Sequence, residues 1–156
     1  MRRWREFGIL FAFVCAGRAA TPTPLPPVAP FPPELSSLRG RVIYLDFWAS
    51  WCAPCRQSFP WMQDLQTRYA SRGLTVIAVN LDQERAAADA FLKHFQPGFQ
   101  IHFDPQGRWA EQFGVKGMPT SVVIDRHGVA RFTHIGFVPD DRRTYAEHVE
   151  QLLAEP

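Results

Sequence analysis

The sequence contains little cysteine, with 3 Cys among 156 residues, and has no marked excess of either charge, with 17 Lys and Arg against 15 Asp and Glu. So few cysteines exclude a small secreted domain whose fold depends on several disulfides. A net charge of +2 gives no electrostatic reason to expect a nucleic-acid partner or an acidic membrane surface. The length excludes a large multidomain enzyme. What is present, a hydrophobic fraction of 46%, is that of an ordinary globular chain.

The first 20 residues have the composition of an export signal. Arginines precede an uncharged, mostly apolar stretch over 7–17, and small residues follow it. This stretch is too short for a membrane-spanning helix, which needs about 20 apolar residues, but it suits the apolar region of a signal peptide. We expect a signal peptide or N-terminal anchor over 1–20 and therefore a periplasmic or other extracytoplasmic location, either soluble after cleavage or tethered by this segment. Lipidation at Cys15 is an alternative.

Half of the 14 prolines lie in the segment 21–33, which reads TPTPLPPVAPFPP. Proline fixes the backbone φ angle and removes an N–H donor, so we expect this segment to join neither a helix nor a central strand. It is predicted to be a semi-rigid linker that precedes one domain over 34–156.

From residue 34 onward, hydrophobic patterns alternate between strands and helices. Nearly continuous apolar runs predict strands buried on both faces, whereas apolar residues on one side predict helices. A final pair of strands, with a turn over 126–128, predicts a hairpin before the last helix. The expected strands are 41–47, 74–81, 100–103, 120–125 and 129–135, and the expected helices are 53–72 (interrupted by Pro60 and closed by Gly73), 84–96, 106–113 and one capped by Asp140 or Asp141. This order predicts an α/β fold with a mixed central sheet flanked by helices.

Cys52 and Cys55 directly follow the first predicted strand and open the first predicted helix. Unpaired N–H groups and the dipole at a helix N-terminus favour a thiolate and thereby lower a cysteine pKa. The spacing brings Cys55 within reach of Cys52 after one helical turn. Disulfide exchange needs an attacking thiolate and a second thiol that resolves the mixed disulfide, and this pair supplies both.

Two other interpretations of the cysteine pair are weaker. A zinc site needs two more ligands, but the chain has no second cysteine pair and its five histidines are scattered. A purely structural disulfide over so short a loop would constrain the unfolded chain very little. We therefore expect no metal and no cofactor.

Together with other motifs, the cysteine pair resembles the thioredoxin superfamily and, more closely, its exported TlpA/ResA-like branch. The motifs follow the family order across nearly all of 34–156. They are DFWASWCAPC over 46–55, Pro60, GMPT over 117–120, Asp125 with Gly128, and Gly136.

The resemblance implies a thioredoxin fold and a role for each residue that matches. Cys52 would attack and Cys55 would resolve, so that the two form the redox disulfide. Pro119 would be a cis-proline opposite the cysteines, and the Met118 backbone would pair with a substrate strand; an ordinary trans proline at the start of a strand is the alternative. Trp51 would shape the surface on which substrate docks.

Asp46 lies within an apolar strand, where loss of solvent should raise the pKa of its carboxyl group. We expect it to accept and return the proton of Cys55, which makes it a third catalytic residue. The alternative is an aspartate satisfied by backbone donors near a strand end.

Three departures from the family pattern concern the surroundings of the cysteines. Ala78 lies where thioredoxin has a lysine partner for the buried aspartate, and Ala53-Pro54 replaces Gly-Pro between the cysteines. ResA-like proteins carry a glutamate after the second strand, and the matching position here is Gln83, between Asp82 and Glu84. These departures leave open whether an acidic group contacts the cysteines from that side.

The expected function is that of an exported, monomeric thiol–disulfide oxidoreductase that reduces disulfides of substrate proteins. The resemblance implies substrates of the cytochrome c maturation or copper-oxidase assembly type, and a membrane protein as electron donor. An oxidant, a copper-handling module and a redox-inactive protein-binding module are alternatives. A peroxidase is disfavoured, because Ala49 lies where peroxidases have a threonine.

Overall fold

The computed structural model describes residues 31–156, so the predicted signal segment 1–20 and most of the predicted linker 21–33 lie outside the described residues. Within the described part of the chain, no helix is both long and apolar enough to cross a membrane. The strands are β1 (Val42–Trp48), β2 (Leu74–Asn80), β3 (Gln100–Phe103), β4 (Thr120–Ile124) and β5 (Ala130–Ile135). The α-helices are α1 (Ala53–Tyr69), α2 (Arg85–Phe95), α3 (Arg108–Gln112) and α4 (Arg142–Ala154), and the 3₁₀ helices are η1 (Pro33–Leu38), η2 (Ala70–Arg72) and η3 (Pro139–Asp141).

The five strands form one mixed sheet in the order β3-β2-β1-β4-β5. Strands β1, β2 and β3 are parallel, whereas β4 runs antiparallel to both β1 and β5. The central strand β1 is buried along its whole length, which explains its nearly continuous apolar sequence. In this register Asp46 lies opposite Ala78 on β2 and opposite Ser121 on β4.

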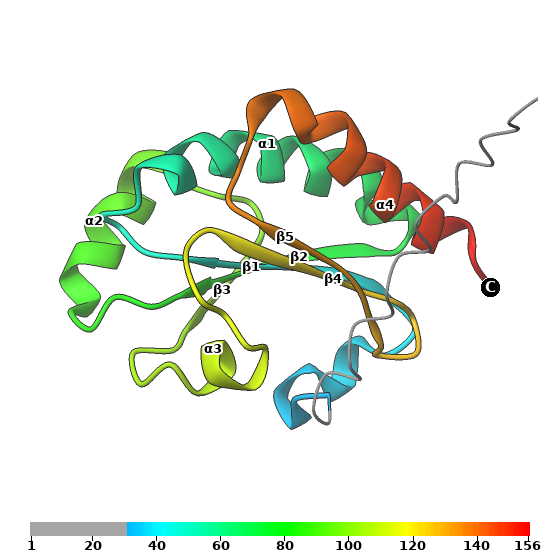
Figure 1. Ribbon diagram of the computed structural model, residues 1–156, viewed down its shortest axis with the longest axis horizontal. Helices are drawn as coiled ribbons and strands as arrows, with labels where there is room; N and C mark the ends of the chain where they lie inside the picture. The colour runs from blue at the N-terminus through cyan, green and yellow to red at the C-terminus, as the bar shows by residue number, and fades with distance from the viewer. Residues whose placement is uncertain (1–30) are drawn as a thin grey trace, which may run out of the picture.

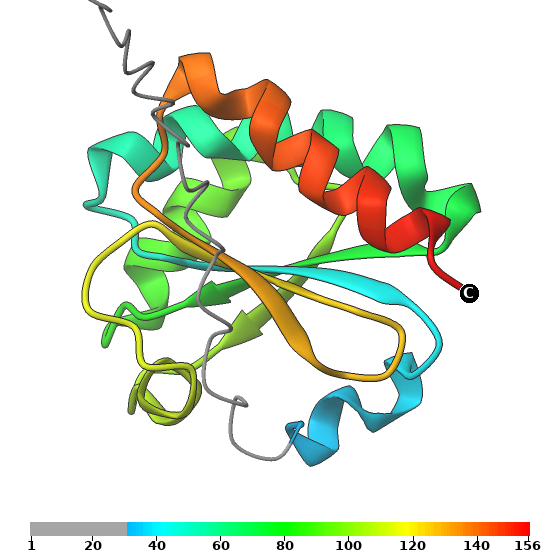
Figure 2. The same ribbon diagram turned by 45° about the vertical axis from the view of Figure 1, so that its right-hand side comes forward.

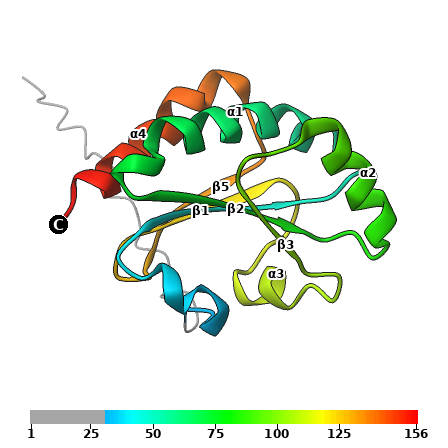
Figure 3. The same cartoon turned by 180° about the vertical axis from the view of Figure 1, so that it is seen from behind.

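Helices cover both faces of the sheet, as the sequence predicts. Helices α1 and α4 lie side by side over one face, and α3 and η1 lie on the other (Figures 1 and 3). Side chains alternate along β1, so that Tyr44 and Trp48 join the core under α1 and α4 whereas Ile43 and Phe47 join the second core with Trp109 of α3. The arrangement is the thioredoxin fold, and Figure 2 shows its twisted sheet between the two helical layers.

Helix α1 runs without a break through Pro60, so the expected interruption there is wrong. A proline removes one backbone hydrogen bond from a helix, but the neighbouring side chains of Phe59, Trp61 and Met62 are buried in the core and fix the helix on the sheet. The helix ends as expected near Gly73, whose φ of +103° lies in the left-handed region that glycine tolerates.

Pro33 is the first residue of η1, so the expectation that the proline-rich segment joins no helix is wrong at its last residue. The reason is positional, because the first residue of a helix needs no N–H donor. Leu35 of η1 is buried in the second core, and Phe31 packs against that core.

The other elements agree with the sequence, apart from the cap of the last helix. The hairpin of β4 and β5 and the short β3 and α3 are confirmed, and α4 buries Tyr145, Val149, Leu152 and Leu153. Asp141 is the N-cap residue of α4, but its side chain makes no capping hydrogen bond. The 3₁₀ turn η3 leads directly into α4, so the backbone at Asp141 is already helical and its side chain does not cap the helix.

Asp104 caps the N-terminus of α3 with its side chain. Its carboxylate accepts hydrogen bonds from the backbone N–H groups of Arg108 and Trp109, both at 2.8 Å, and of Ala110 at 3.2 Å. Because Asp104 follows β3 and is buried, these bonds fasten α3 to the sheet and hold Trp109 in the second core.

We expect Asp104→Ala to lower the free energy of unfolding by about 2 kcal/mol, because it leaves three N–H groups at a helix start without their acceptor. Urea unfolding measures this loss. Asp89→Ala is the matched control, since Asp89 is exposed and its i,i+4 ion pair with Arg85 lies on the helix surface, and it should cost less than about 0.5 kcal/mol. Equal losses in the two variants would contradict the capping role.

Candidate active site

Cys52 and Cys55 form a disulfide at the N-terminus of α1. Cys52 is the N-cap residue, and its sulfur accepts a hydrogen bond from the backbone N–H of Cys55 at 3.3 Å. Cys52 is 4% exposed whereas Cys55 is fully buried, so Cys52 offers the sulfur that another molecule can reach. This position confirms the expected placement of the pair at the start of a helix that follows a buried strand.

The residues expected to bind substrate lie at the same end of the sheet as the cysteines. The peptide bond between Met118 and Pro119 is cis, as expected. Pro119 immediately precedes β4, whose first residue Thr120 pairs with Phe47 near the end of β1, where the cysteine loop begins. Met118 packs against the core that contains both cysteines.

Two hydrogen bonds hold the loop around the cis-proline. The Thr120 hydroxyl donates to the carbonyl oxygen of Gly117 at 2.7 Å, and the Gly136 N–H donates to the carbonyl oxygen of Pro119 at 2.7 Å. Trp51 is 71% exposed directly before Cys52 and presents a large apolar surface beside the sulfur. An exposed aromatic of this size beside a reactive group suits contact with another polypeptide.

Asp46 is 1% exposed and lies on the face of β1 that α1 covers, because it is two residues from Tyr44 and from Trp48 and so shares their face. Burial raises the pKa of its carboxyl group to about 7, and a hydrogen bond from Ser121 partly opposes this rise. The Ser121 hydroxyl donates to Oδ1 of Asp46 at 2.6 Å. The carboxylate is therefore held by a side-chain hydroxyl and not by the backbone donors that the sequence left as an alternative.

Asp82 is the acidic residue that reaches the active-site loop. Its carboxylate accepts hydrogen bonds from the N–H and the hydroxyl of Ser50, both at 2.9 Å, and from the side-chain amide of Asn80 at 2.7 Å. Ser50 lies two residues before Cys52, so Asp82 fixes the backbone that leads into the cysteine pair. The sequence leaves open whether an acidic group reaches the cysteines from the region of Asp82, Gln83 and Glu84; of these three residues Asp82 is buried, whereas Gln83 and Glu84 are exposed.

The only sequence signal for Asp82 is an acidic residue directly after a predicted buried strand. Its partner lies 32 residues away along the chain, so no local pattern identifies the contact.

A small cavity of about 300 Å³ lies beside Trp51 and is formed partly by α2. The Arg56 guanidinium donates to the Ser50 carbonyl oxygen at 3.1 Å and lies over the Phe91 ring, 5.2 Å from its centroid. Helix α2 therefore contributes to the surface that surrounds the cysteines. The lining residues are Ser50, Trp51, Arg56, Ala87, Ala90, Phe91 and His94.

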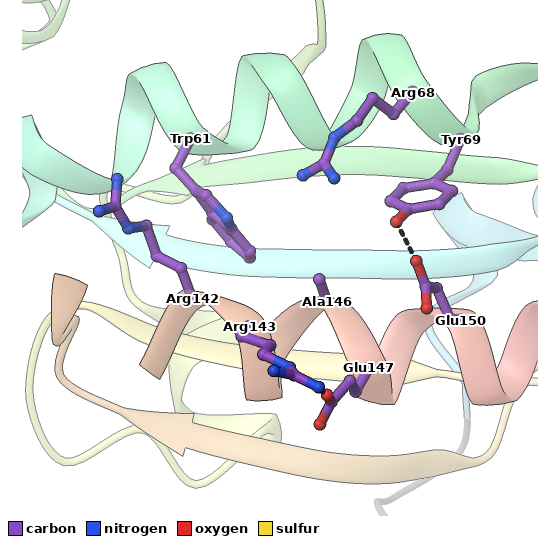
Figure 4. A pocket seen from close by; sticks show the side chains of 8 residues that line it. All are labelled: Trp61, Arg68, Tyr69, Arg142, Arg143, Ala146, Glu147 and Glu150. Atoms are coloured by element: carbon purple, nitrogen blue, oxygen red, sulfur yellow. Dashed lines mark hydrogen bonds and ion pairs between the residues drawn. The ribbon is translucent and has the colours of Figure 1, made fainter. Parts of the chain in front are cut away.

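A second groove, of about 520 Å³, runs between α1 and α4 (Figure 4). Its polar groups are largely satisfied by one another: the Tyr69 hydroxyl donates to Glu150, and Arg143 pairs with Glu147 at 2.8 Å. Neither cysteine lines this groove, so it is separate from the disulfide site.

Within residues 31–156, no three His, Cys, Asp or Glu side chains gather in an arrangement that could hold a metal ion. Reactive groups of the described site are the two sulfurs and the buried carboxyl group of Asp46.

Known proteins of similar sequence carry names that refer to disulfide chemistry. The thiol-disulfide oxidoreductase ResA of Bacillus thuringiensis is 34% identical over 95 residues, which cover 61% of this chain and 55% of the relative. The ResA of Geobacillus thermodenitrificans is 30% identical over 119 residues, which cover 76% of this chain and 67% of the relative. For several of the curated relatives, the chain spans only about half of their length.

Solved structures show the same fold. A Chlorobium tepidum protein, provisionally named thiol:disulfide interchange protein DsbE, is 48% identical with a TM-score of 0.76, and the match covers 77% of this chain and 85% of that one. A Bacteroides thetaiotaomicron protein, provisionally named a protein disulfide isomerase, is 26% identical with a TM-score of 0.70, and the match covers 78% and 79%.

The family itself is identified over most of the chain. Residues 20–150 match the sequence model of the Redoxin family, and this region includes β1, both cysteines and the cis-proline. The chain therefore belongs to the Redoxin family, within the thioredoxin superfamily.

Proposed function

We propose that the protein is a thiol–disulfide oxidoreductase that reduces disulfides in substrate proteins through Cys52 and Cys55. The observation that carries the proposal is the Cys52–Cys55 disulfide at the start of α1, on the same end of the sheet as the cis-proline loop. The names of the related ResA proteins and of the Chlorobium tepidum structure support it.

The reaction begins with the reduced protein. Unpaired N–H groups at the start of α1 favour the thiolate of Cys52, which attacks one sulfur of a substrate disulfide and expels the other as a thiolate. Cys55 then attacks the Cys52 sulfur and releases the second substrate thiolate. Two electrons pass from the protein dithiol to the substrate, and the Cys52–Cys55 disulfide is the product.

Asp46 handles the proton of Cys55 in this scheme. The Cys55 thiol must lose a proton before it attacks, and a carboxylate whose pKa is about 7 exchanges protons readily near neutral pH. Asp46 lies on the face of β1 that α1 covers, the helix that carries Cys55. Burial excludes bulk water from Asp46 and from Cys55, so the Cys55 thiol needs a nearby group of the protein to accept its proton.

The proposal also includes the cellular compartment, the substrate, the electron donor and the oligomeric state. The basic and apolar start of the chain supports export to an extracytoplasmic compartment. The resemblance to the TlpA/ResA-like branch supports apocytochrome c or a copper-receiving oxidase subunit as substrate. A membrane electron donor would then reduce the disulfide again, and the protein would act as a monomer.

We expect Cys55→Ser to trap a mixed disulfide, because the variant keeps the attacking sulfur and lacks the one that resolves. When the reduced variant is mixed with a peptide that contains one disulfide, mass spectrometry should show a covalent adduct at Cys52 that dithiothreitol reverses. The wild-type protein should release reduced peptide without accumulating the adduct, and Cys52→Ser with Cys55→Ser should form none. If Cys55→Ser forms no adduct while the wild-type dithiol binds Cu(I) tightly, the copper-handling alternative is correct instead.

We expect Asp46→Asn to change how stability depends on pH. The folded-state pKa of about 7 lies above the usual value near 4, so the folded state binds this proton more tightly than the unfolded state. The free energy of unfolding should therefore fall as pH rises from about 4 to about 7, by an amount on the order of 4 kcal/mol. Asp46→Asn removes this decline, so the oxidised variant should be more stable than wild type at pH 8 and similar to it at pH 4.

Urea unfolding of the oxidised proteins at both pH values measures this effect. Asp64→Asn is the matched control, because Asp64 is an exposed residue that pairs with Arg68 on the helix surface. A decline that is the same in wild type and Asp46→Asn would show that Asp46 does not have a raised pKa.

A further inference from the structure

Ser121 is the residue that holds the buried carboxylate. It lies directly opposite Asp46 in the register of β1 and β4, and its hydroxyl donates to Oδ1 of Asp46 at 2.6 Å. Both side chains are buried, so water does not compete strongly for this hydrogen bond. A hydrogen bond between a hydroxyl and a carboxylate is among the stronger ones in a protein.

On the other side of β1, the neighbouring strand β2 offers Asp46 no hydrogen-bond donor from the side chain in register with it. On β2 the residue in register with Asp46 is Ala78, whose side chain has no polar group. Among the hydrogen bonds of residues 31–156, the one from Ser121 reaches Oδ1, while Oδ2 has no partner. The stability of the ionised form of Asp46 therefore depends strongly on this one hydroxyl, whereas water would stabilise an exposed carboxylate.

The position of Ser121 in the chain links it to the reacting end of the sheet. It lies two residues after the cis-proline Pro119, on the strand that begins beside the cysteine loop. The backbone that carries the expected substrate contact at Met118 thus also carries the hydroxyl that holds Asp46.

We propose that Ser121 is a positioning residue of the reaction: its hydroxyl orients Asp46 and stabilises the ionised carboxylate that takes the proton from Cys55. This inference rests on the proposed function. The thiol proton of Cys55 passes to Asp46, the resulting thiolate attacks the Cys52 sulfur in the mixed disulfide, and the substrate leaves as a thiolate. Asp46 returns the proton to Cys55 when the disulfide is reduced again.

The effect of Ser121 on the pKa of Asp46 agrees with this role. A donor to the charged form of an acid lowers its pKa, and the Ser121 hydroxyl opposes the larger rise that burial causes in the Asp46 pKa. Without the hydroxyl, a larger fraction of Asp46 would stay protonated at neutral pH and would be unable to accept a proton.

The other titratable groups on this side of the sheet include Tyr44 on β1, His134 on β5, and Tyr145 and His148 on α4. Burial, followed by the charge of Asp46, raises the pKa of Tyr44 well above its usual value, and a hydrogen bond with Ser121 partly opposes this rise. Burial lowers the pKa of His134 to about 4. Burial also lowers the pKa of His148. Tyr44 and His134 therefore titrate well away from pH 7, so a change in rate near pH 7 that depends on Asp46 is distinguishable from theirs.

The test is stopped-flow reaction of each reduced protein with a dithiobis(nitrobenzoate) disulfide between pH 5 and 9. Attack by Cys52 releases one coloured thiolate and resolution by Cys55 releases the second, so the two steps are separate phases. In wild type the resolution rate should rise with pH as Asp46 ionises, and the raised pKa of Asp46, about 7 in the oxidised protein, places this rise within the pH range measured. Ser121→Ala should raise the midpoint of this rise by about one pH unit and slow resolution by up to about tenfold at pH 6, while the attack phase is unchanged.

Matched variants separate the hydroxyl from the shape of the side chain. Ser121→Thr keeps the hydroxyl and should keep the wild-type midpoint, whereas Ser121→Val has nearly the same shape as threonine without the hydroxyl and should behave like Ser121→Ala. In an Asp46→Asn background, Ser121→Ala should no longer shift the profile, because the group that it acts through is gone.

A midpoint that stays at the wild-type value in both Ser121→Ala and Ser121→Val would overturn the role of Ser121, as would a shift that persists in the Asp46→Asn background. Failure of the proposed function has a different signature: no resolution phase in wild type, together with no trapped adduct in Cys55→Ser. Two coloured phases with an unchanged midpoint would therefore refute only the present inference.

Discussion

The structure depends on the burial of β1 between two helical layers. Every residue of this strand is buried, and the two cores on either side of the sheet meet along it. Because β1 is fixed from both faces, the loop that follows it starts from a rigid point, and α1 begins only five residues after the strand ends. The cysteine pair thus belongs to a rigid element although Trp51, next to it, is largely exposed.

The same burial imposes a cost at Asp46. A carboxylate taken out of water loses its solvation, and the raised pKa of Asp46 is the direct expression of that loss. One hydrogen bond from Ser121 offsets part of it. A more completely satisfied carboxylate would be more stable and would stay ionised throughout the neutral range, but it would then bind a proton too weakly to exchange one with a thiol.

Features that depend on local sequence were predictable, whereas those that depend on contacts between distant strands were not. The apolar runs, the start of a helix after Cys52 and the hairpin of β4 and β5 follow from patterns of a few residues, and the structure confirms them. The contacts of Asp82 with Ser50 and of Ser121 with Asp46 join residues 32 and 75 positions apart. They depend on the strand order and register, which hydrophobic patterns alone do not specify. The errors at Pro33 and Pro60 have a related cause, because position within a helix and tertiary packing outweighed the local effect of proline.

Three strands contribute residues to the surroundings of the cysteine loop. The end of β1 places the sulfurs, the residues after β2 hold the loop before Cys52 through Asp82, and β4 brings both the cis-proline and the hydroxyl of Ser121. The contacts of Asp82 and of Ser121 share no residue, so a change in one need not disturb the other. Gln83 lies where the sequence comparison places a glutamate, yet the loop before Cys52 is still anchored. Asp82, one residue earlier, supplies a buried carboxylate to Ser50. In the proposed reaction, the position of the loop before Cys52 and the proton transfer at Cys55 thus depend on separate pairs of residues.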